Sequence, residues 1–170
     1  MSAISSNSKH RIVWVWGQIT PQLRSELIAF WADNGALADP CEAWRRTFEV
    51  ASVVLDEEGR LAGVCSVYCA YSPGAGAFYW FYRTFIRTDC RDVGLAPRLF
   101  AHTFEQLALA YADEPQAPVG VMIVVENPKL HTAAGIRVIE RAGFQHLGID
   151  DSGQSVWHRL FRPLEQEPAR

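Results

Sequence analysis

The segment RDVGLAPRLF, residues 91–100, separates two stretches of sequence with different periodicities. The preceding run FYWFYRTFI is rich in aromatic residues, which favours a strand, whereas apolar residues recur at helical spacing from Gly94 to Ala112. The chain must therefore pass from a strand into a helix through a glycine turn. Backbone amides at a helix N-terminus lack intrahelical partners and lie at the positive end of the helix dipole. This turn is therefore suited to binding an anion, and a phosphate ester is its natural ligand.

The other strands and helices predict a mixed α/β fold. Thr20-Pro21 supplies an N-cap and a first-turn proline for a helix that stops at Asn34-Gly35. The continuous apolar run 119–127 favours a strand covered on both faces, reached from the aromatic strand by a helical crossover and therefore parallel to it. The predicted order is β-α-α-β-β-β-α-β-α-β-β, with about seven strands and about four helices. Strands are predicted over residues 11–17, both arms of a hairpin turning at 57–59, and residues 74–88, 119–127, 144–150 and 155–161, and helices over residues 20–34, 42–47, 94–112 and 130–142.

Composition indicates one globular domain. The chain has 170 residues, 49% of them hydrophobic, and we expect that domain to span residues 11–163, with a disordered polar leader over residues 1–10 and a frayed tail over residues 164–170. The net charge of -3 gives no basic footprint for nucleic acid or an anionic membrane, and no apolar run approaches the roughly 20 residues of a membrane-spanning helix. We therefore expect a soluble cytoplasmic protein that binds neither nucleic acid nor a membrane. The four cysteines lack paired CxxC spacing, so we expect no metal.

The glycine turn alone leaves its role open. A glycine between a strand and a helix often provides only a tight connection. As a phosphate site, the turn would gain a charged contact from Arg98 in the first helical turn. A P-loop requires GxxxxGK followed by Ser or Thr, and a Rossmann fingerprint requires GxGxxG after an early strand. The turn has neither pattern, so nucleoside triphosphates and dinucleotides are disfavoured ligands.

Residues 86–96, IRTDCRDVGLA, resemble the R/Q-x-x-G-x-G/A acyl-CoA pyrophosphate loop of the GNAT N-acetyltransferase superfamily. Arg91, Gly94 and Ala96 occupy its three defining positions. Residues 140–144, ERAGF, resemble the end of that family's second signature, where a helix stops at Gly-Phe before a strand, and the predicted element order matches over nearly the whole chain. The resemblance implies a mixed central sheet in which the strand before the loop and the strand after its helix splay apart to admit pantetheine.

The same resemblance implies a donor substrate, acetyl-CoA or another acyl-CoA. It assigns the amides of the turn to the diphosphate and exposed strand backbone to pantetheine. The implied donor-binding residues are Phe85, Ile86, Arg91, Asp92, Val93, Gly94, Leu95, Ala96, Arg98 and Asn127.

Acyl transfer to an amine requires a neutral nucleophile and, preferably, a proton for the departing thiolate. A lysine-like amine, with a pKa near about 10.4, is mostly protonated at neutral pH and would be helped by a base such as Glu126, which could equally be a solvent-facing strand terminus. Many members of the family use a tyrosine as proton donor four residues before the Gly-Phe pair, where this chain has Ile139. His131, Tyr82 and Tyr79 are candidate substitutes, although each also fits a surface or packing role.

The aromatic strand suggests where an acceptor binds. Its aromatic residues must alternate between the two faces, so one face is expected in the core and the other lines an acceptor pocket or forms a homodimer contact. We predict that Trp31, Trp44 and Tyr79 bind the acceptor, a small-molecule or peptide amine whose identity the sequence does not indicate. The expected function is an N-acetyltransferase that acts by direct attack in a ternary complex. The alternative is a non-catalytic acyl-CoA-binding or sensing module, which the isoleucine at position 139 favours.

Overall fold

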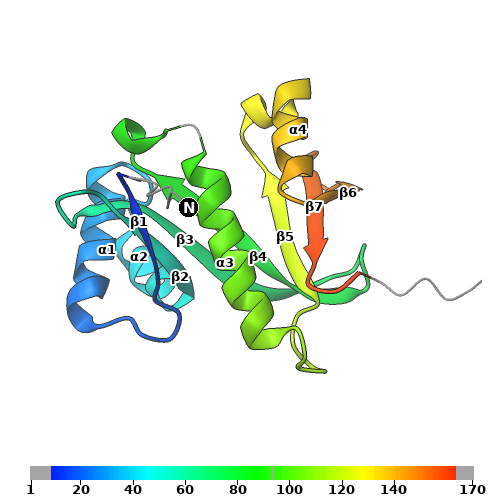
Figure 1. The fold of residues 1–170 in the computed structure, drawn as a ribbon, viewed down its shortest axis with the longest axis horizontal. Helices are drawn as coiled ribbons and strands as arrows, with labels where there is room; N and C mark the ends of the chain where they lie inside the picture. Colours follow the sequence, from blue (N-terminus) through cyan, green and yellow to red (C-terminus); the bar gives the residue numbers. More distant parts are fainter. Residues whose placement is uncertain (1–8, 93, 164–170) are drawn as a thin grey trace, which may run out of the picture. The chain divides into compact units, whose positions relative to one another are not determined.

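The structure, a computed structural model, describes residues 9–92 and 94–163. Residues 1–8 of the predicted leader, Val93 and the predicted tail lie outside the described residues. The helices and strands follow the predicted order, which confirms the mixed α/β class (Figure 1). They are β1 Arg11–Trp14, α1 Pro21–Asp33, α2 Pro40–Arg46, β2 Val50–Leu55, β3 Leu61–Ser72, β4 Ala77–Ile86, α3 Leu95–Tyr111, β5 Gly120–Val125, α4 Ala133–Arg141, β6 Gln145–Ile149 and β7 Ser155–Leu160. Short 3-10 helices are η1 Thr47–Glu49, η2 Thr88–Cys90 and η3 Pro128–His131.

The strands form a seven-stranded mixed sheet in the order β1-β2-β3-β4-β5-β7-β6. β4 and β5 are parallel, as predicted for two strands joined by the crossover helix α3. Their ladder pairs Trp80 with Val121 and Phe81 with Met122, and β5 pairs along its whole length with β7 on its other side.

Residues 9–66 and 84–103, apart from Val93, form one compact unit. α1 begins as predicted, because the Thr20 hydroxyl accepts a hydrogen bond from the Leu23 amide and Pro21 occupies the first turn. Apolar side chains of α1, α2, β2 and β3 pack into one buried cluster. The other face of β2 is covered as well, because Thr103 of α3 donates a 3.0 Å hydrogen bond to the buried Ser52 hydroxyl. The glycine turn thus opens into a helix held firmly on the sheet of this unit.

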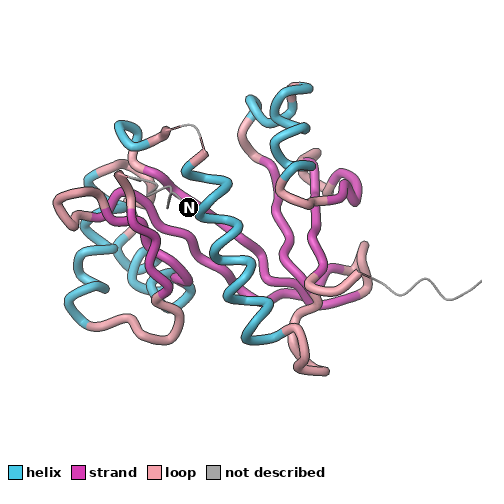
Figure 2. Tube along the Cα trace, in the orientation of Figure 1, coloured by secondary structure: helices cyan, strands magenta, loops and turns pink. Residues whose placement is uncertain are grey.

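Residues 67–83 and 104–163 form the second compact unit. Arg159 of β7 contacts two helices of this unit. Its guanidinium lies 3.8 Å from the centroid of the Phe104 ring, and its NH1 donates a 3.0 Å hydrogen bond to the Ala142 carbonyl. β7 is therefore in contact with both the second half of α3 and the end of α4. Figure 2 shows β5 and β7 side by side, with η3 and α4 at the end of β5.

The last helix starts later than predicted. A helix was expected from residue 130, but residues 128–131 form the separate turn η3 and α4 begins at Ala133. The cause is Thr132, whose hydroxyl accepts a hydrogen bond from the Gly135 amide and acts as the N-cap. The predicted stop is confirmed, since Gly143 follows the helix with a φ of 89°.

Gly120, the first residue of β5, tolerates no side chain. A Cβ at this position would overlap the Arg159 carbonyl oxygen and lie 2.8 Å from the Leu160 Cα. We expect Gly120→Val to lower the free energy of unfolding by about 2 kcal/mol and Tm by roughly 6 °C, measured by thermal melts. Gly74→Val is the matched control, because a Cβ at Gly74 meets no atom within 4 Å. Equal melting temperatures for the two variants would contradict this account of β5.

Candidate functional site

Gly94 forms part of the turn that leads into α3. Gly94 adopts a φ of 96°, and a Cβ built on it would meet no atom within 4 Å, so this backbone faces open space. The Leu95 amide donates to the Asp92 carbonyl at 3.3 Å, and the helix then starts with the buried Leu95 side chain. Ala96 and Arg98 are exposed in the first helical turn. The Arg98 amide donates to the Gly94 carbonyl at 3.1 Å, whereas amides earlier in a first helical turn have no intrahelical acceptor. This backbone is open enough to accept an anion, which the predicted diphosphate contact requires.

Arg91 ties the turn to the end of β4. Its Nε donates a 2.8 Å hydrogen bond to the Ile86 carbonyl, and its guanidinium lies 5.6 Å from the centroid of the Phe85 ring. Phe85 in turn packs edge-on against Phe30 of α1. The Ile86 carbonyl, which the resemblance assigned to pantetheine, therefore already has a partner within the protein.

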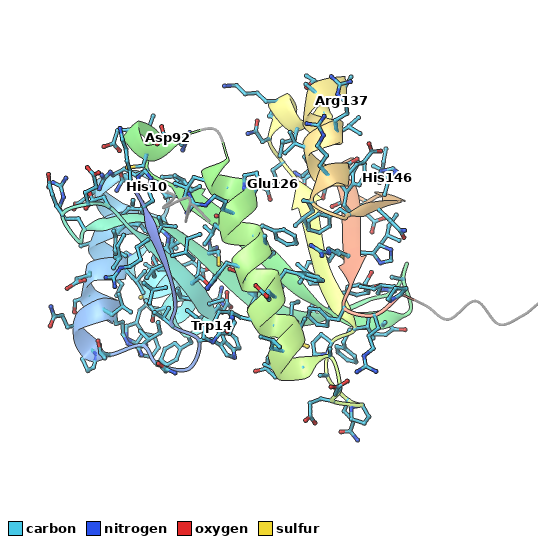
Figure 3. All side chains as sticks on the ribbon, in the orientation of Figure 1. His10, Trp14, Asp92, Glu126, Arg137 and His146 are labelled. Carbon is cyan, nitrogen blue, oxygen red and sulfur yellow. The ribbon has the colours of Figure 1, made fainter. Side chains whose placement is uncertain are left out.

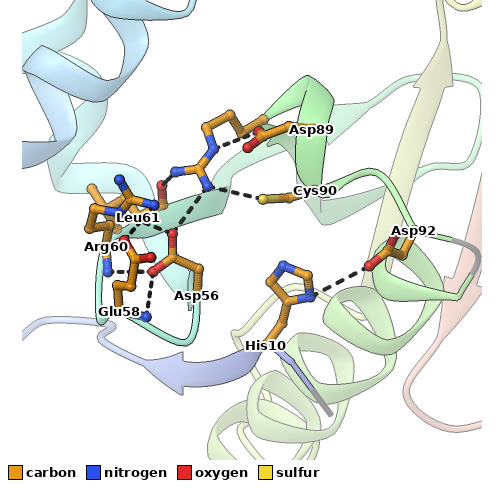
Figure 4. Close-up of polar contacts among 9 residues, drawn as sticks. His10, Asp56, Glu58, Arg60, Leu61, Asp89, Cys90 and Asp92 are labelled. Carbon is orange, nitrogen blue, oxygen red and sulfur yellow. Dashed lines mark hydrogen bonds and ion pairs between the residues drawn. The ribbon is translucent and has the colours of Figure 1, made fainter.

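A second arginine, Arg87, directly precedes η2, and its guanidinium binds Asp56, Leu61, Asp89 and Cys90, which Figure 4 labels. Its guanidinium donates to Asp56 Oδ2 at 3.1 Å, to Asp89 Oδ1 at 2.6 Å and to the Leu61 carbonyl at 2.9 Å. Burial by itself raises the pKa of the Asp56 carboxyl, but hydrogen bonds from Arg60 and Arg87 outweigh burial and hold that pKa at about 2. The hydrogen bond from Arg87 likewise lowers the pKa of Asp89. Both acids are therefore ionised at neutral pH.

The low pKa of Asp56 makes stability depend on pH. A carboxyl whose pKa is lower in the folded than in the unfolded protein stabilises the fold when the pH is above its unfolded-state pKa, about 3.9 for aspartate. That stabilisation is lost as the pH falls through its folded-state pKa. We expect Asp56→Asn to be less stable than wild type at about pH 6, and the difference to shrink toward about pH 2, in urea titrations. Glu57→Gln, an exposed neighbour in the same turn, is the control. A difference that stays constant with pH would contradict the role of Asp56.

Two of the predicted catalytic residues lie together at the end of β5. Glu126 directly follows Val125 and is exposed (Figure 3). His131 approaches the same point from η3, where its Nε2 donates a 3.1 Å hydrogen bond to the Val125 carbonyl. Because that nitrogen carries the proton, the neutral ring presents Nδ1 as an acceptor. Tyr82, the third catalytic candidate, is half-buried on β4, one residue beyond the parallel ladder.

Asn127, predicted near the pantetheine arm, has a local structural role. Its side-chain oxygen accepts a hydrogen bond from the Lys129 amide at 3.0 Å and caps η3. Its carbonyl accepts another from the Leu130 amide. Asn127 thereby shapes the turn that brings His131 back to β5.

Two of the predicted acceptor-binding residues are buried. Trp31 is 3% exposed within the core of the first unit, and Tyr79 is 2% exposed, with its hydroxyl 2.8 Å from Nδ1 of His158. Burial raises the pKa of Tyr79 and lowers that of His158, so both are neutral at pH 7. Side chains this deep offer no surface to an acceptor, and we do not assign them that role. Trp44, in contrast, is 53% exposed.

An exposed aromatic pair on α2 and η1 lies beside the guanidinium of Arg24. Trp44 packs edge-on against Phe48, with ring centroids 4.8 Å apart. The Arg24 guanidinium lies 4.1 Å from the Phe48 centroid and donates to the Thr47 hydroxyl at 2.9 Å. This surface combines exposed rings with a positive charge, features that suit an aromatic or anionic ligand.

Sequence reasoning missed the polar groups that support the turn. Arg87, Asp56 and His10 were not singled out, although Nδ1 of His10 lies 4.0 Å from Asp92 Oδ2. Asp56 and Arg87 are 31 residues apart, and no spacing pattern connects them. The neighbouring strands β3 and β4 bring them together, because β3 begins just after the Asp56 turn and β4 ends just before η2.

Two features were not found in the described part of the chain. Among residues 9–92 and 94–163, no three His, Cys, Asp or Glu side chains are grouped as a metal site would require. Within the same ranges, no helix combines the length and apolar character needed to cross a membrane.

Comparison with known proteins identifies the fold. No protein-family model matches the sequence, and no curated protein is detectably similar to it. Solved structures do match. A GNAT superfamily phosphinothricin acetyltransferase from Sinorhizobium meliloti, in complex with acetyl-CoA, has a TM-score of 0.66 at 13% identity, covering 95% of this chain and 94% of that one.

Two further structures agree with that match. The ribosomal-protein-S5-alanine acetyltransferase from Vibrio fischeri has a TM-score of 0.64 at 13% identity, covering 94% of this chain and 96% of its own. NAA60 from Arabidopsis thaliana, in complex with acetyl-CoA, has a TM-score of 0.55 at 12% identity, covering 89% and 98%. These likenesses bear out the predicted fold: the chain has the fold of the GNAT superfamily of acetyltransferases.

Proposed function

We propose that this protein is an acyl-CoA-dependent N-acyltransferase that transfers an acetyl group to a primary amine. One observation carries the proposal: an open glycine turn with a positive φ at Gly94 leads into α3, within a GNAT fold. Structures of this fold from Sinorhizobium meliloti and Arabidopsis thaliana are complexes with acetyl-CoA.

The donor diphosphate is assigned to the turn. The amides of Gly94 and Ala96 are assigned as donors at the positive end of α3, and Arg98 adds a charged contact from the first helical turn. Leu95, whose amide donates to the Asp92 carbonyl, is assigned to this site by the family resemblance. Asp92 and Val93 complete the predicted loop, with Arg91 holding it to the end of β4. Phe85 and Ile86 are assigned to the adjoining pantetheine, and Asn127 to the same arm by the family resemblance.

Transfer requires the protein to manage two protons. Bound acyl-CoA supplies an acyl group activated as a thioester. We assign Glu126 the task of taking a proton from the acceptor ammonium, because its exposed carboxylate follows directly on β5. His131, whose ring is oriented by the Val125 carbonyl, is assigned the role of proton donor to the departing thiolate. In its imidazolium form it would give up the Nδ1 proton while Nε2 stays bonded to that carbonyl. Tyr82 is the other candidate donor.

The acceptor is proposed to contact the exposed surface around Trp44. The phosphinothricin acetyltransferase and the ribosomal-protein-S5-alanine acetyltransferase named above act on a small molecule and on a protein, so the fold serves acceptors of both kinds. Arg24 and Phe48 accompany Trp44 on this surface, which favours an amine that also carries an aromatic or acidic group.

A second function is favoured by one specific residue. Ile139 stands where many acetyltransferases of this family carry a proton-donating tyrosine, and it is 5% exposed in α4. An aliphatic side chain donates no proton, so a protein that binds acyl-CoA without turnover, as a sensing module, is the alternative.

Two measurements separate these functions. Calorimetric titration with acetyl-CoA tests the donor site, and an assay of free CoA with a panel of small and peptide amines tests transfer. Micromolar binding with amine-dependent CoA release is the expected result. Binding without release for any amine would favour the sensing module, and a folded protein that does not bind acetyl-CoA would refute both functions.

A further inference from the structure

We propose that Arg87 is a positioning residue of the donor site, whose guanidinium holds the glycine turn in the conformation that binds the diphosphate. Arg87 itself is not assigned any contact with acyl-CoA. The inference rests on the proposed function, because it concerns how the same site is built.

The first argument is the number of elements that Arg87 joins. Its backbone amide donates to the Ala62 carbonyl at 2.8 Å and its NH1 donates to the Leu61 carbonyl, which anchor it on β3. Its Nε and NH2 bind Asp89 and Cys90 of η2, with distances of 2.6 Å to Oδ1 and 3.2 Å to Sγ. One guanidinium thus connects a central strand with the 3-10 turn that immediately precedes Arg91.

The second argument is that the other end of this connection is rigid. Asp56 Oδ1 accepts hydrogen bonds from the Glu58 and Arg60 amides, which closes the β2–β3 turn around the carboxylate. The second oxygen, Oδ2, then accepts from NH2 of Arg87 at 3.1 Å. The two side chains are largely buried, 11% exposed for Asp56 and 20% for Arg87, so solvent screens this pair less than a surface pair.

The third argument is geometric. The planar guanidinium reaches four acceptors in three directions at once, which the single ammonium of a lysine at the same position would not do. Downstream of η2, the Asp92 amide donates to the Cys90 carbonyl at 2.8 Å and the Leu95 amide to the Asp92 carbonyl. A continuous series of hydrogen bonds therefore leads from the β2–β3 turn through Arg87 and η2 to the start of α3. Figure 4 draws the part of this series between Asp56 and Cys90.

The test compares two ligands that differ in the diphosphate. Acetyl-CoA carries it, whereas acetyl-pantetheine has the same thioester arm without it. We expect Arg87→Lys to raise the Kd for acetyl-CoA about tenfold, equivalent to losing one charge-assisted hydrogen bond, and to leave the Kd for acetyl-pantetheine within about twofold of wild type, both by calorimetry. A purely structural role would weaken both ligands alike.

Two further variants make the test robust. Asp56→Asn removes the acceptor at the far end of the connection and should show the same selective loss, so it carries the test if Arg87→Lys does not fold. Arg60→Ala is the matched control, because Arg60 also binds Asp56 Oδ2 but is 63% exposed and is bonded to Glu58 rather than to η2. We expect this control to keep wild-type affinity for acetyl-CoA.

The outcomes are distinguishable. Wild-type affinity for acetyl-CoA in both Arg87→Lys and Asp56→Asn would overturn the positioning role, and so would an equal loss for the two ligands. A wild-type protein that binds neither ligand would instead refute the proposed function, on which this inference depends.

Discussion

Gly94→Glu is expected to lose at least about 100-fold in affinity for acetyl-CoA while the protein remains folded. The φ of 96° at Gly94 is unfavourable for any other residue, and the open space beside its Cα is where the diphosphate is proposed to lie. A carboxylate there repels the diphosphate and obstructs the amides of the turn. Calorimetric titration of the purified variant with acetyl-CoA measures the loss.

Backbone strain must be separated from the charge in this experiment. Gly153→Glu is a matched control, because Gly153 has a φ of 80° and equally open surroundings, but lies in the β6–β7 turn. It should show a similar loss of stability and unchanged affinity. Gly94→Ala adds the strain without the charge and is expected to bind acetyl-CoA more tightly than Gly94→Glu. If wild type and Gly94→Glu bind equally well, the turn is only a connection between strand and helix.

Glu126→Gln is expected to lower kcat by about 10²-fold at neutral pH without changing the Kd for acetyl-CoA. The amide keeps the size of the side chain but does not accept the acceptor's proton. Without Glu126, the reaction depends on amine that has already lost its proton to solvent. The loss of kcat should therefore shrink as the pH rises toward the pKa of the amine, about 10. Rates of CoA release as a function of pH, with whichever amine is active, measure this.

Glu140→Gln controls for the loss of an acidic group, because Glu140 is an exposed residue of α4 in the same unit. It should retain wild-type kcat at every pH. Full activity of Glu126→Gln at neutral pH would refute its role as the base, and Glu126 would be only a solvent-facing residue at the end of a strand. His131 would then be the next candidate for the base.

Much of the fold was predictable because its signals are local. A helix N-cap needs only a hydroxyl and the next few amides, so Thr20 and Pro21 correctly predicted where α1 begins. The same logic explains the error at α4. Thr132 is also an N-cap, and ignoring it extended the predicted helix back through residues that form η3.

The candidate site was only partly predictable. The glycine turn depends on a positive φ that glycine adopts readily, so its position could be recognised from the residue type and the change in periodicity. The acceptor side could not be. Trp31 and Trp44 are equally aromatic in sequence, yet one lies in the core and the other at the surface. Helical spacing does not show which face of α1 or α2 the rest of the chain covers.

The sequence by itself determined the order of elements, the turn that opens α3 and the isoleucine at position 139, because each depends on residues that are neighbours in the chain. Only the tertiary structure decided which aromatic side chains are buried, that His131 returns to the end of β5, and that Arg87 reaches Asp56. Those properties arise from strand pairing and packing between distant segments. Their energies depend on which surfaces meet, and that information is spread over the whole chain rather than held in any short motif.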